Sequence, residues 1–455
     1  MTPGMTYSGH ARAILTLGLP LIGGHLGQVA IGVTDTVMLG WYSVEALAAV
    51  TLGSTYFFVL MIFGSGYAWA VMPMVATFAA EEDDTSIRRA TRMGIWLSLG
   101  FACCALPVML LAGPLLRMLG QGEALAADAG AYLAVAGWGI FPALLVMVLK
   151  SYLAALERTQ IVLWITLLAA LANGLANYAF IFGNWGAPEL GLVGAAIASL
   201  LTQVVALIGV VAYILIVVPQ HKLFVRFWRL DRQMLKRVFT LGWPISLTSL
   251  SEVGLFAASA MMMGWLGTIP LAAHGIVMQL TSLTFMVHLG LSNVATIRVG
   301  NAHGRRDQPH MVRGALMVTM MSVLFAFITI GLFVGWPEPL IALFMRADEP
   351  ARVEILTIGV VLLAMAALFQ LVDGAQAVAL GLLRGAHDTA VPMWMAAFSY
   401  WGIGVPTSYI LGFVFGFEGV GVWSGLVIGL LFASVLLNTR FWRVVLPRVG
   451  AYAPA

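Results

Sequence analysis

The sequence predicts an all-α membrane protein with twelve transmembrane helices, built as two six-helix bundles. Three observations predict this fold: the composition, the length of the apolar runs and an internal repeat. Hydrophobic residues make up 61% of the 455 residues and charged residues only 9%, whereas soluble domains carry roughly 25% charged residues. Because so few charges cannot cover a water-exposed surface of this size, we expect most of the exterior to face lipid.

Twelve apolar runs are long enough to cross a bilayer, which takes about 20 residues of helix. The second and eighth runs are the longest, and we expect them to tilt or to extend beyond the membrane at one end. The expected spans are 14–38, 46–79, 93–113, 131–153, 161–183, 191–218, 240–264, 271–300, 314–335, 355–383, 391–415 and 419–438.

The basic residues predict the orientation, since cytoplasmic loops of membrane proteins are rich in Lys and Arg. With twelve crossings both termini lie on one side, and the segments on that side hold eighteen of the 23 Lys and Arg residues. The opposite loops hold three: Arg117, Arg346 and Arg352. We therefore expect both termini to be cytoplasmic. The same rule explains the basic central loop, so we predict no nucleic-acid partner.

An internal repeat is visible without gaps at an offset of 224 residues. The segment TLGLP at 16–20 returns as TLGWP at 240–244, and Asp83 in one loop corresponds to Asp307 in another. Later, LAALERT resembles LRGAHDT at a slightly larger offset. Several matches in register are hard to obtain by chance, so the chain is predicted to be a tandem duplication.

The duplication predicts an N-terminal bundle at 1–220 and a C-terminal bundle at 221–455. An even number of helices gives both bundles the same orientation, which relates them by a pseudo-two-fold axis along the membrane normal. Pro20 and Pro244 occupy matched positions inside the first helix of each bundle. Because proline within a helix frees a backbone carbonyl and permits a kink, we expect both to act as hinges.

Three carboxylates lie inside the predicted spans: Asp35, Glu252 and Asp373. A charged side chain at the membrane centre costs about 3 kcal/mol or more, so such residues persist where they pair, bind an ion or protonate. Unpaired carboxylates in an apolar setting have the properties that a proton or Na⁺ coupling site needs. The alternative is a carboxylate that accepts hydrogen bonds and only shapes packing.

The repeat shows that the carboxylates are asymmetric. Glu252 corresponds to Gln28, and Asp35 corresponds to Ser259. Asn173 and Asn177 are four residues apart and share a helix face, so they are expected either to line a polar pocket with Asp35 or to join helices by hydrogen bonds. The further substrate or polar-pocket candidates are Gln28, Gln279, His288 and Phe369, together with Gln370 and Gln376, which flank Asp373.

The sequence contains no motif of soluble enzymology. It has no P-loop, no HExxH and no Cys/His cluster of metal-binding type, so neither an enzyme nor an ATP-driven pump is expected. No cofactor is expected either. If transport is uphill, its energy must come from an ion gradient.

Over essentially its whole length the chain resembles the multidrug and toxic compound extrusion (MATE) family. The motifs that carry the resemblance are TLGLP with Asp35-Thr36-Val37-Met38-Leu39-Gly40, TLGWP with Glu252, and FQLVDGAQAVALGLLRGAHDT with Asp373. The resemblance implies two six-helix bundles that export small organic cations in exchange for Na⁺ or H⁺. It also implies a bacterial-type inner membrane location and function as a monomer.

The pair Glu252 and Asp373 is similar to that of the NorM-type subgroup, in which these positions are implicated in cation coupling, often with Na⁺. The resemblance implies that Asp35 changes protonation and takes part in drug release. The sequence departs from the subgroup at Phe369, where an aromatic hydroxyl is expected; a Na⁺ site that used this oxygen would lose it. The alternatives are a lipid-intermediate flippase of the same superfamily and a non-transporting membrane scaffold or receptor.

Overall fold

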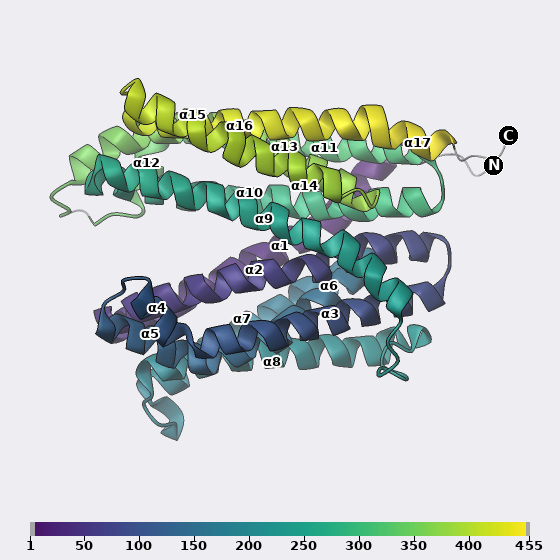
Figure 1. Cartoon of the computed structure of the whole chain (residues 1–455), viewed down its shortest axis with the longest axis horizontal. Coiled ribbons are helices and arrows are strands. Elements are labelled where there is room, and N and C mark those ends of the chain that lie inside the picture. Colours follow the sequence, from purple (N-terminus) through teal and green to yellow (C-terminus); the bar gives the residue numbers. More distant parts are fainter. Residues whose placement is uncertain (1–4, 347, 452–455) are drawn as a thin grey trace. The chain divides into compact units, whose positions relative to one another are not determined.

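The computed structural model describes residues 5–346 and 348–451, and every regular element among them is a helix (Figure 1). A helix satisfies its own backbone hydrogen bonds, which a chain surrounded by lipid requires. Eleven helical runs of the described residues are long and apolar enough to cross a membrane. The twelve predicted spans all coincide with helical segments, so the all-α membrane fold is confirmed.

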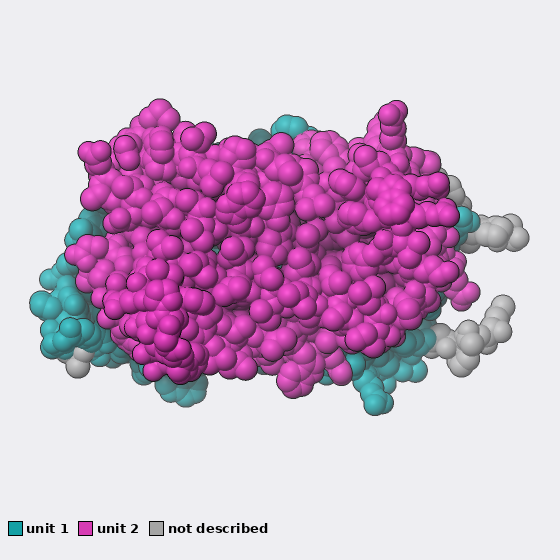
Figure 2. All heavy atoms as spheres, turned by 90° about the horizontal axis from the view of Figure 1, so that it is seen from below, with its two compact units in different colours: residues 1–18, 247–455 teal, residues 19–246 magenta. Residues whose placement is uncertain are grey.

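The described chain divides into two compact units, which Figure 2 shows in different colours. Unit 2 consists of residues 19–246 and unit 1 of residues 5–18 and 247–451. The helices of unit 2 begin with the larger part of α1 (Tyr7–Tyr42) and end with the first part of α9 (Arg232–Leu266). Between them lie α2 (Val44–Ala80), α3 (Asp84–Leu110), α4 (Ala112–Met118), α5 (Glu123–Ala136), η1 (Gly137–Gly139), α6 (Ile140–Ala155), α7 (Thr159–Phe182), η2 (Asn184–Gly186), α8 (Gly191–Val217) and η3 (Pro219–His221).

Unit 1 contains the remainder of α9, and within it α13 packs against both α10 and α16 (Figure 1). Some of the long helices are followed in the chain by short helices that were not predicted from the sequence. The helices of this unit are α10 (Thr268–Gly304), α11 (Gln308–Gly335), α12 (Pro337–Ala342), α13 (Arg352–Gly385), α14 (Ala390–Ala397), η4 (Phe398–Gly404), α15 (Val405–Tyr409), η5 (Ile410–Val414), α16 (Glu418–Arg440), η6 (Phe441–Val445) and α17 (Leu446–Ala451).

The predicted span 391–415 is a helical run in which the hydrogen-bonding pattern changes. It begins as α14, becomes a π-helix over η4, returns to α-helix at α15 and ends in a second π segment, η5. π segments inside helices are rare and frequently occur at functional sites. This run therefore spans the expected length without forming one uninterrupted α-helix.

Two helices pass from one unit to the other close to the matched prolines. The boundary in α1 lies between residues 18 and 19, next to Pro20, and the boundary in α9 lies between residues 246 and 247, close to Pro244. Both prolines lie inside continuous helices. The predicted boundary between the bundles, at 220/221, was derived from the sequence repeat and stays a prediction. The hinge role of the two prolines also stays a prediction.

The repeat is visible in the local structure of both units. Asp83 caps α3 by accepting the Ser86 backbone N–H at 2.9 Å, and Asp307 caps α11 by accepting the His310 backbone N–H at 3.0 Å. The residues just before these caps, Glu82 and Arg306, have left-handed φ angles of 57° and 56°. The 224-residue offset thus reproduces the same turn and cap.

Within unit 1, the first turns of α1, the start of α11 and the end of the chain lie at one end. Arg298 of α10 bonds His10 Nδ1 at 3.1 Å and His310 Nε2 at 2.8 Å. At the same end, Gln308 Nε2 donates to the Leu446 carbonyl at 3.1 Å. The first described turns of α1 and the segment around Leu446 therefore lie close to the basic loop at 305–307.

Candidate functional site

In unit 2, Asp35 of α1 lies within a set of hydrogen-bond donors from two other helices. Asn173 Nδ2 and Asn177 Nδ2 donate to Asp35 Oδ1 at 2.9 and 2.6 Å, and Ser199 Oγ donates to Oδ2 at 3.3 Å. The predicted association of Asp35 with the two asparagines is present in the structure. Ser199 on α8 was not predicted, because a single serine in an apolar helix gives no signal.

The two asparagines meet Asp35 because they are one helical turn apart on α7. Both are fully buried, and Asn177 Nδ2 also contacts Asn173 Oδ1 at 3.3 Å. A shared helix face is the arrangement expected for residues four apart. A carboxylate with three donors has most of its hydrogen-bonding capacity satisfied by the protein, which lowers the cost of keeping it in a buried place.

In unit 1, Glu252 of α9 and Asp373 of α13 form the second acidic site. Gln376 Nε2, one turn beyond Asp373, donates to Glu252 Oε1 at 2.9 Å. Asp373 is only 2% exposed, and its main electrostatic interaction is repulsion by Glu252. The two carboxylates are therefore near enough to act on each other.

The surroundings of these carboxylates contain polar atoms without partners. Among the described residues, Asp373 Oδ1, Gln376 Oε1 and the Tyr400 hydroxyl have no hydrogen-bond partner although they are buried. Few buried polar groups in proteins lack a partner, and each that does asks for an explanation. In unit 1 a carboxylate oxygen itself lacks a partner, whereas among the described residues of the unit 2 site the oxygen without a partner is Asn177 Oδ1 and not an oxygen of Asp35.

Arg384 near the end of α13 also acts on this site. It attracts the Glu252 carboxylate electrostatically. A long arginine side chain can extend along its helix, so Arg384 acts on Glu252 from the end of α13. Asp373 receives no such attraction among its leading interactions.

A second polar group of unit 1 surrounds His288 of α10. His288 Nδ1 bonds Ser322 Oγ at 2.8 Å, and its ring packs edge-on against Phe325. Gln370, one turn before Gly374 on α13, donates to the Thr284 hydroxyl of α10. His288 Nε2 and Gln370 Oε1 are buried without partners among the described residues. This polar group extends along α10 and α13 on the side that holds Asp373.

Phe369 does not supply an oxygen and is part of an aromatic cluster. Its ring centroid is 5.9 Å from that of Phe256 and 5.8 Å from that of Trp423. Trp423 in turn donates from Nε1 to His274 Nδ1 at 3.1 Å. Phe369 is 1% exposed, so it fills the core beside the acidic site.

The other two predicted polar residues are not joined to the carboxylates. Gln28 on α1 and Gln279 on α10 are both exposed, and no hydrogen bond of the described residues links either one to Asp35, Glu252 or Asp373. Their role in a polar pocket stays a prediction.

Tyr400, like Ser199, was not predicted from the sequence. It is fully buried and lies in the π segment η4. Its phenol lies within electrostatic range of Glu252 and Asp373 and faces the Gln376 side chain. No spacing rule points to it, because the repeat does not align it with a polar residue that we had singled out.

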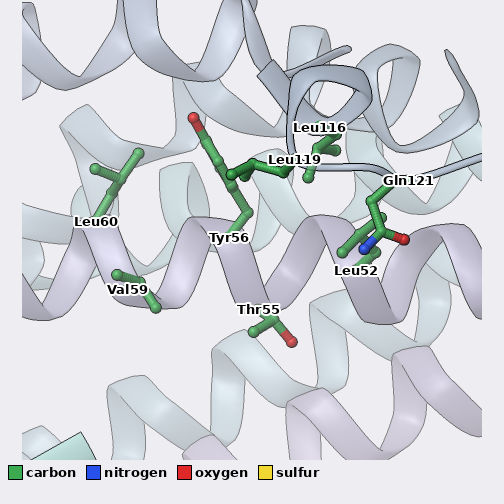
Figure 3. A pocket seen from close by; sticks show the side chains of 8 residues that line it. All are labelled: Leu52, Thr55, Tyr56, Val59, Leu60, Leu116, Leu119 and Gln121. Atoms are coloured by element: carbon green, nitrogen blue, oxygen red, sulfur yellow. The ribbon is translucent and has the colours of Figure 1, made fainter. Parts of the chain in front are cut away.

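A separate pocket in unit 2 is almost entirely apolar and contains none of the predicted site residues (Figure 3). Its volume is about 350 Å³. The residues that line it are Leu52, Thr55, Tyr56, Val59, Leu60, Leu116, Leu119 and Gln121. In the described part of the chain, no group of three or more His, Cys, Asp or Glu side chains could hold a metal ion.

Long apolar helices in two units, a duplicated sequence and buried acidic sites define a multi-pass helical membrane protein with an internal repeat. The chain belongs to the MatE family, whose model matches it twice, at residues 20–179 and 244–410. Residue 244 lies 224 residues after residue 20, so the two matches begin at the offset of the repeat and at its matched prolines.

Curated relatives support the NorM-type subgroup. The chain is 44% identical over 448 residues to a "Probable multidrug resistance protein NorM" of Rhizobium meliloti, covering 98% of this chain and 96% of the relative. It is also 44% identical over 438 residues to a protein of the same name from Agrobacterium fabrum, covering 96% and 94%.

Solved structures with lower identity share the fold. A eukaryotic MATE transporter, AtDTX14, superposes with a TM-score of 0.86 at 15% identity, covering 98% of both chains. A multidrug resistance MATE family transporter in an outward-facing conformation superposes with a TM-score of 0.85 at 22% identity, covering 98% of this chain and 97% of that chain. These likenesses support the fold.

Proposed function

We propose that the protein is a secondary active antiporter that exports small organic cations, including drugs, in exchange for Na⁺ or H⁺. The curated relatives are named for multidrug resistance, and the chain has the family's fold. Glu252 and Asp373 are assigned to the coupling cation, and Asp35 is assigned a change of protonation, with Asn173 and Asn177 as its supporting residues.

The observation that carries the proposal is the pair of neighbouring carboxylates in unit 1. Asp373 is buried and is repelled by Glu252, and Arg384 attracts Glu252 but is not among the groups that act on Asp373, so a charged Asp373 is costly without a visiting cation. An excess of negative charge also suits a cationic substrate better than the anionic pyrophosphate of a lipid intermediate. This difference favours the antiporter over the flippase.

The exchange needs only that the two cargoes compete for the same negative charge. When Na⁺ or H⁺ neutralises Glu252 and Asp373, the charge that attracts an organic cation is removed and its affinity falls. When the carboxylates are empty, their charge favours binding of the organic cation. Because coupling free energies are reciprocal, each cargo then lowers the affinity for the other.

The direction of export rests on the orientation of the chain. The basic loops and both termini are assigned to the cytoplasm by the excess of Lys and Arg on that side, and the described ends of the chain lie at one end of unit 1. The relatives are bacterial, so the membrane is assigned as a bacterial inner membrane. We assign function to the monomer, since each acidic site is complete within one chain.

The test is transport by purified protein in lipid vesicles with the Asp373→Asn variant. Asparagine keeps the size of the side chain and removes its negative charge, so ethidium movement driven by an imposed Na⁺ or pH gradient should be lost. The two gradients are applied separately, which identifies the coupling ion. Asp128→Asn on α5, an exposed carboxylate, is the matched control and should transport as the wild type does.

Unchanged ethidium transport by Asp373→Asn would refute the assignment of this carboxylate to coupling. No ethidium movement by the wild-type protein under either gradient would favour a flippase or a non-transporting scaffold. Circular dichroism and gel filtration of each variant show whether a loss of transport is a loss of folding.

A further inference from the structure

Two histidines and one arginine hold the first turns of α1 in unit 1. His10 of α1 is fully buried, and its Nδ1 atom lies 3.1 Å from Arg298 Nη2 of α10. The same Nη2 atom lies 2.8 Å from Nε2 of His310, near the start of α11. Arg313 Nη1 of α11 also donates to the Met5 carbonyl at 3.1 Å. Three helices therefore meet at one guanidinium group and two imidazole rings.

The contacts with Arg298 fix the charge of both rings. A guanidinium group carries only hydrogen-bond donors and keeps its proton, so His10 Nδ1 and His310 Nε2 must be acceptors that carry no hydrogen. Each ring is therefore neutral while it is bound to Arg298. A protonated imidazole has a hydrogen on both nitrogens and accepts no hydrogen bond. One proton on either ring thus turns a hydrogen bond into a repulsive contact.

The surroundings of the two rings are mainly positive. The centroids of the rings of His10 and His310 are 4.6 Å apart, so a charge on one ring also repels a charge on the other. The charged groups that act on the rings lie on α10 and α11 and in the turn between them, and they are Arg298, Arg305, Arg313 and Asp307. Three arginines outweigh one aspartate, so this place fits two neutral rings.

We propose that His10 and His310 form a pH-sensitive anchor: as neutral rings they hold the start of α1 on α10 and α11 through Arg298, and proton uptake by the rings releases it. The anchored turns belong to unit 1, whereas α1 continues into unit 2 and carries Asp35 there. With the orientation proposed above, this end of the chain is cytoplasmic, and the anchor responds to cytoplasmic pH. It uses none of the residues of the two acidic sites.

Proton linkage gives the expected size of the effect. A released imidazole binds a proton with an ordinary pKa of about 6.5, whereas a ring bound to Arg298 excludes the proton. Lowering the pH from about 7.5 to about 5.5 therefore favours release by about tenfold for each ring and about a hundredfold for both. The anchor is intact above about pH 6.5 and weakens as the pH falls below this value.

The test is hydrogen–deuterium exchange of residues 7–13 in purified full-length protein in detergent, at about pH 7.5 and about pH 5.5. Each rate is divided by the intrinsic rate at the same pH, because amide exchange itself depends on pH. Protection of the start of α1 should fall by about tenfold to a hundredfold in acid. The start of α7 in unit 2, residues 159–165, is the internal control and should keep its protection.

Amide side chains provide variants that keep the acceptors and do not titrate in this range. Asparagine at position 10 places an oxygen near the position of Nδ1, and glutamine at position 310 places one near the position of Nε2. The double variant His10→Asn/His310→Gln should therefore protect the start of α1 equally at both pH values. His10→Phe/His310→Phe keeps two rings without acceptors and should show low protection even at the higher pH.

His303→Gln is the matched control. His303 lies near the same end of α10, where its ring packs on that of His387, and it is not among the groups that act on His10 or His310. This variant should keep the pH response of the wild type. Circular dichroism and gel filtration show whether each variant is folded, and the wild-type measurement stands without any variant.

Three outcomes overturn the inference. The first is equal protection of the wild-type start of α1 at both pH values. The second is an undiminished loss of protection in acid by His10→Asn/His310→Gln, which would place the titrating groups elsewhere. The third is a parallel loss at the start of α7, which would reflect general unfolding in acid. The proposed antiport is tested separately by Asp373→Asn in vesicles, so its failure leaves the anchor standing.

Discussion

Asp35 in unit 2 and Asp373 in unit 1 are both aspartates inside long membrane helices, yet their surroundings differ in kind. Asp35 accepts hydrogen bonds from two asparagines and one serine. Asp373 has an oxygen without a partner among the described residues and a second carboxylate, Glu252, nearby. The protein supplies donors to the Asp35 carboxylate, although Asn177 Oδ1 beside it has no partner, whereas at Asp373 a carboxylate oxygen itself has none.

This contrast indicates that the hydrogen-bond donors and acceptors around an intramembrane carboxylate decide which ligand that carboxylate can bind. The donors around Asp35 satisfy its ionised form, so a metal ion would have to compete with them, and protonation is the simpler change there. Around Asp373 the unsatisfied groups are oxygens, and oxygens are satisfied by a cation or by added protons. A duplicated fold has thus acquired two chemically distinct acidic sites.

We expect the largest change in folding stability when each aspartate is replaced by leucine, with opposite signs for Asp35 and Asp373. Asp35→Leu leaves the buried amides of Asn173 and Asn177 without their acceptor, which should cost on the order of 3 kcal/mol. Asp373→Leu removes a repelled carboxylate with an unsatisfied oxygen and should raise stability in Na⁺-free buffer. Thermal melting of both variants in detergent measures the two effects.

Saturating Na⁺ provides the control for this pair. The wild type and Asp35→Leu should both gain stability from Na⁺, while Asp373→Leu should gain little, because its cation site has lost a ligand. Destabilisation of similar size in both variants would show that the two acidic sites are satisfied to the same degree and would remove the contrast between them.

The fold could be predicted from the sequence because few backbone structures can cross a lipid bilayer. Helices of at least about 20 apolar residues are the simplest way to cross a bilayer, so composition and run length located the spans. The repeat was equally readable, since Asp83 and Asp307 form the same cap in the structure. The short helices α4 and α12 and the π segments escaped prediction because neither apolar run length nor spacing encodes them.

The acidic sites were only partly predictable. The carboxylates and Asn173 with Asn177 stood out because polar groups in an apolar run are costly. Tyr400 did not stand out, because tyrosine is common in membrane helices and its partners come from other segments of the chain. Phe369 suggested a missing oxygen, and only the structure shows that the phenol of Tyr400 lies within electrostatic range of the same carboxylates.

A smaller effect on stability is expected at a packing feature that the two units share, a crowded glycine near the start of a long helix. Gly194 and Gly421 are each the fourth residue of the last long helix of their unit. An added Cβ would lie 2.2 Å from the Phe180 oxygen at Gly194 and 2.4 Å from the Leu411 carbonyl carbon at Gly421. Backbone atoms cannot move aside as side chains do, so alanine at either position should cost about 2 kcal/mol.

Thermal melting of Gly194→Ala and Gly421→Ala measures this cost, and the two losses should be equal within error. Gly174→Ala and Gly331→Ala are the controls, one in each unit, because nothing lies within 4 Å of an added Cβ at either position. These two should be stabilised by about 0.5–1 kcal/mol, as alanine is the better helix former. A large loss at only one of the crowded glycines would show that the shared packing has diverged.

The smallest expected effect concerns the matched helix caps, which should behave alike in both units. Asp83→Ala and Asp307→Ala each remove a carboxylate that accepts a backbone N–H in the first turn, so each should cost about 1 kcal/mol. Asparagine at either position, which also caps helices, is the control and should restore most of the loss.

The cap of unit 2 also predicts a pH dependence. Hydrogen bonds from Ser86 hold the pKa of Asp83 below its ordinary value of 3.8, so the ionised form is favoured in the folded state. Its contribution to stability is complete above pH 3.8 and is lost as the pH falls through the lowered pKa. Melting curves of the wild type and Asp83→Ala should therefore converge under strongly acid conditions. A constant difference between them at every pH would show that the carboxylate acts through packing and not through its charge.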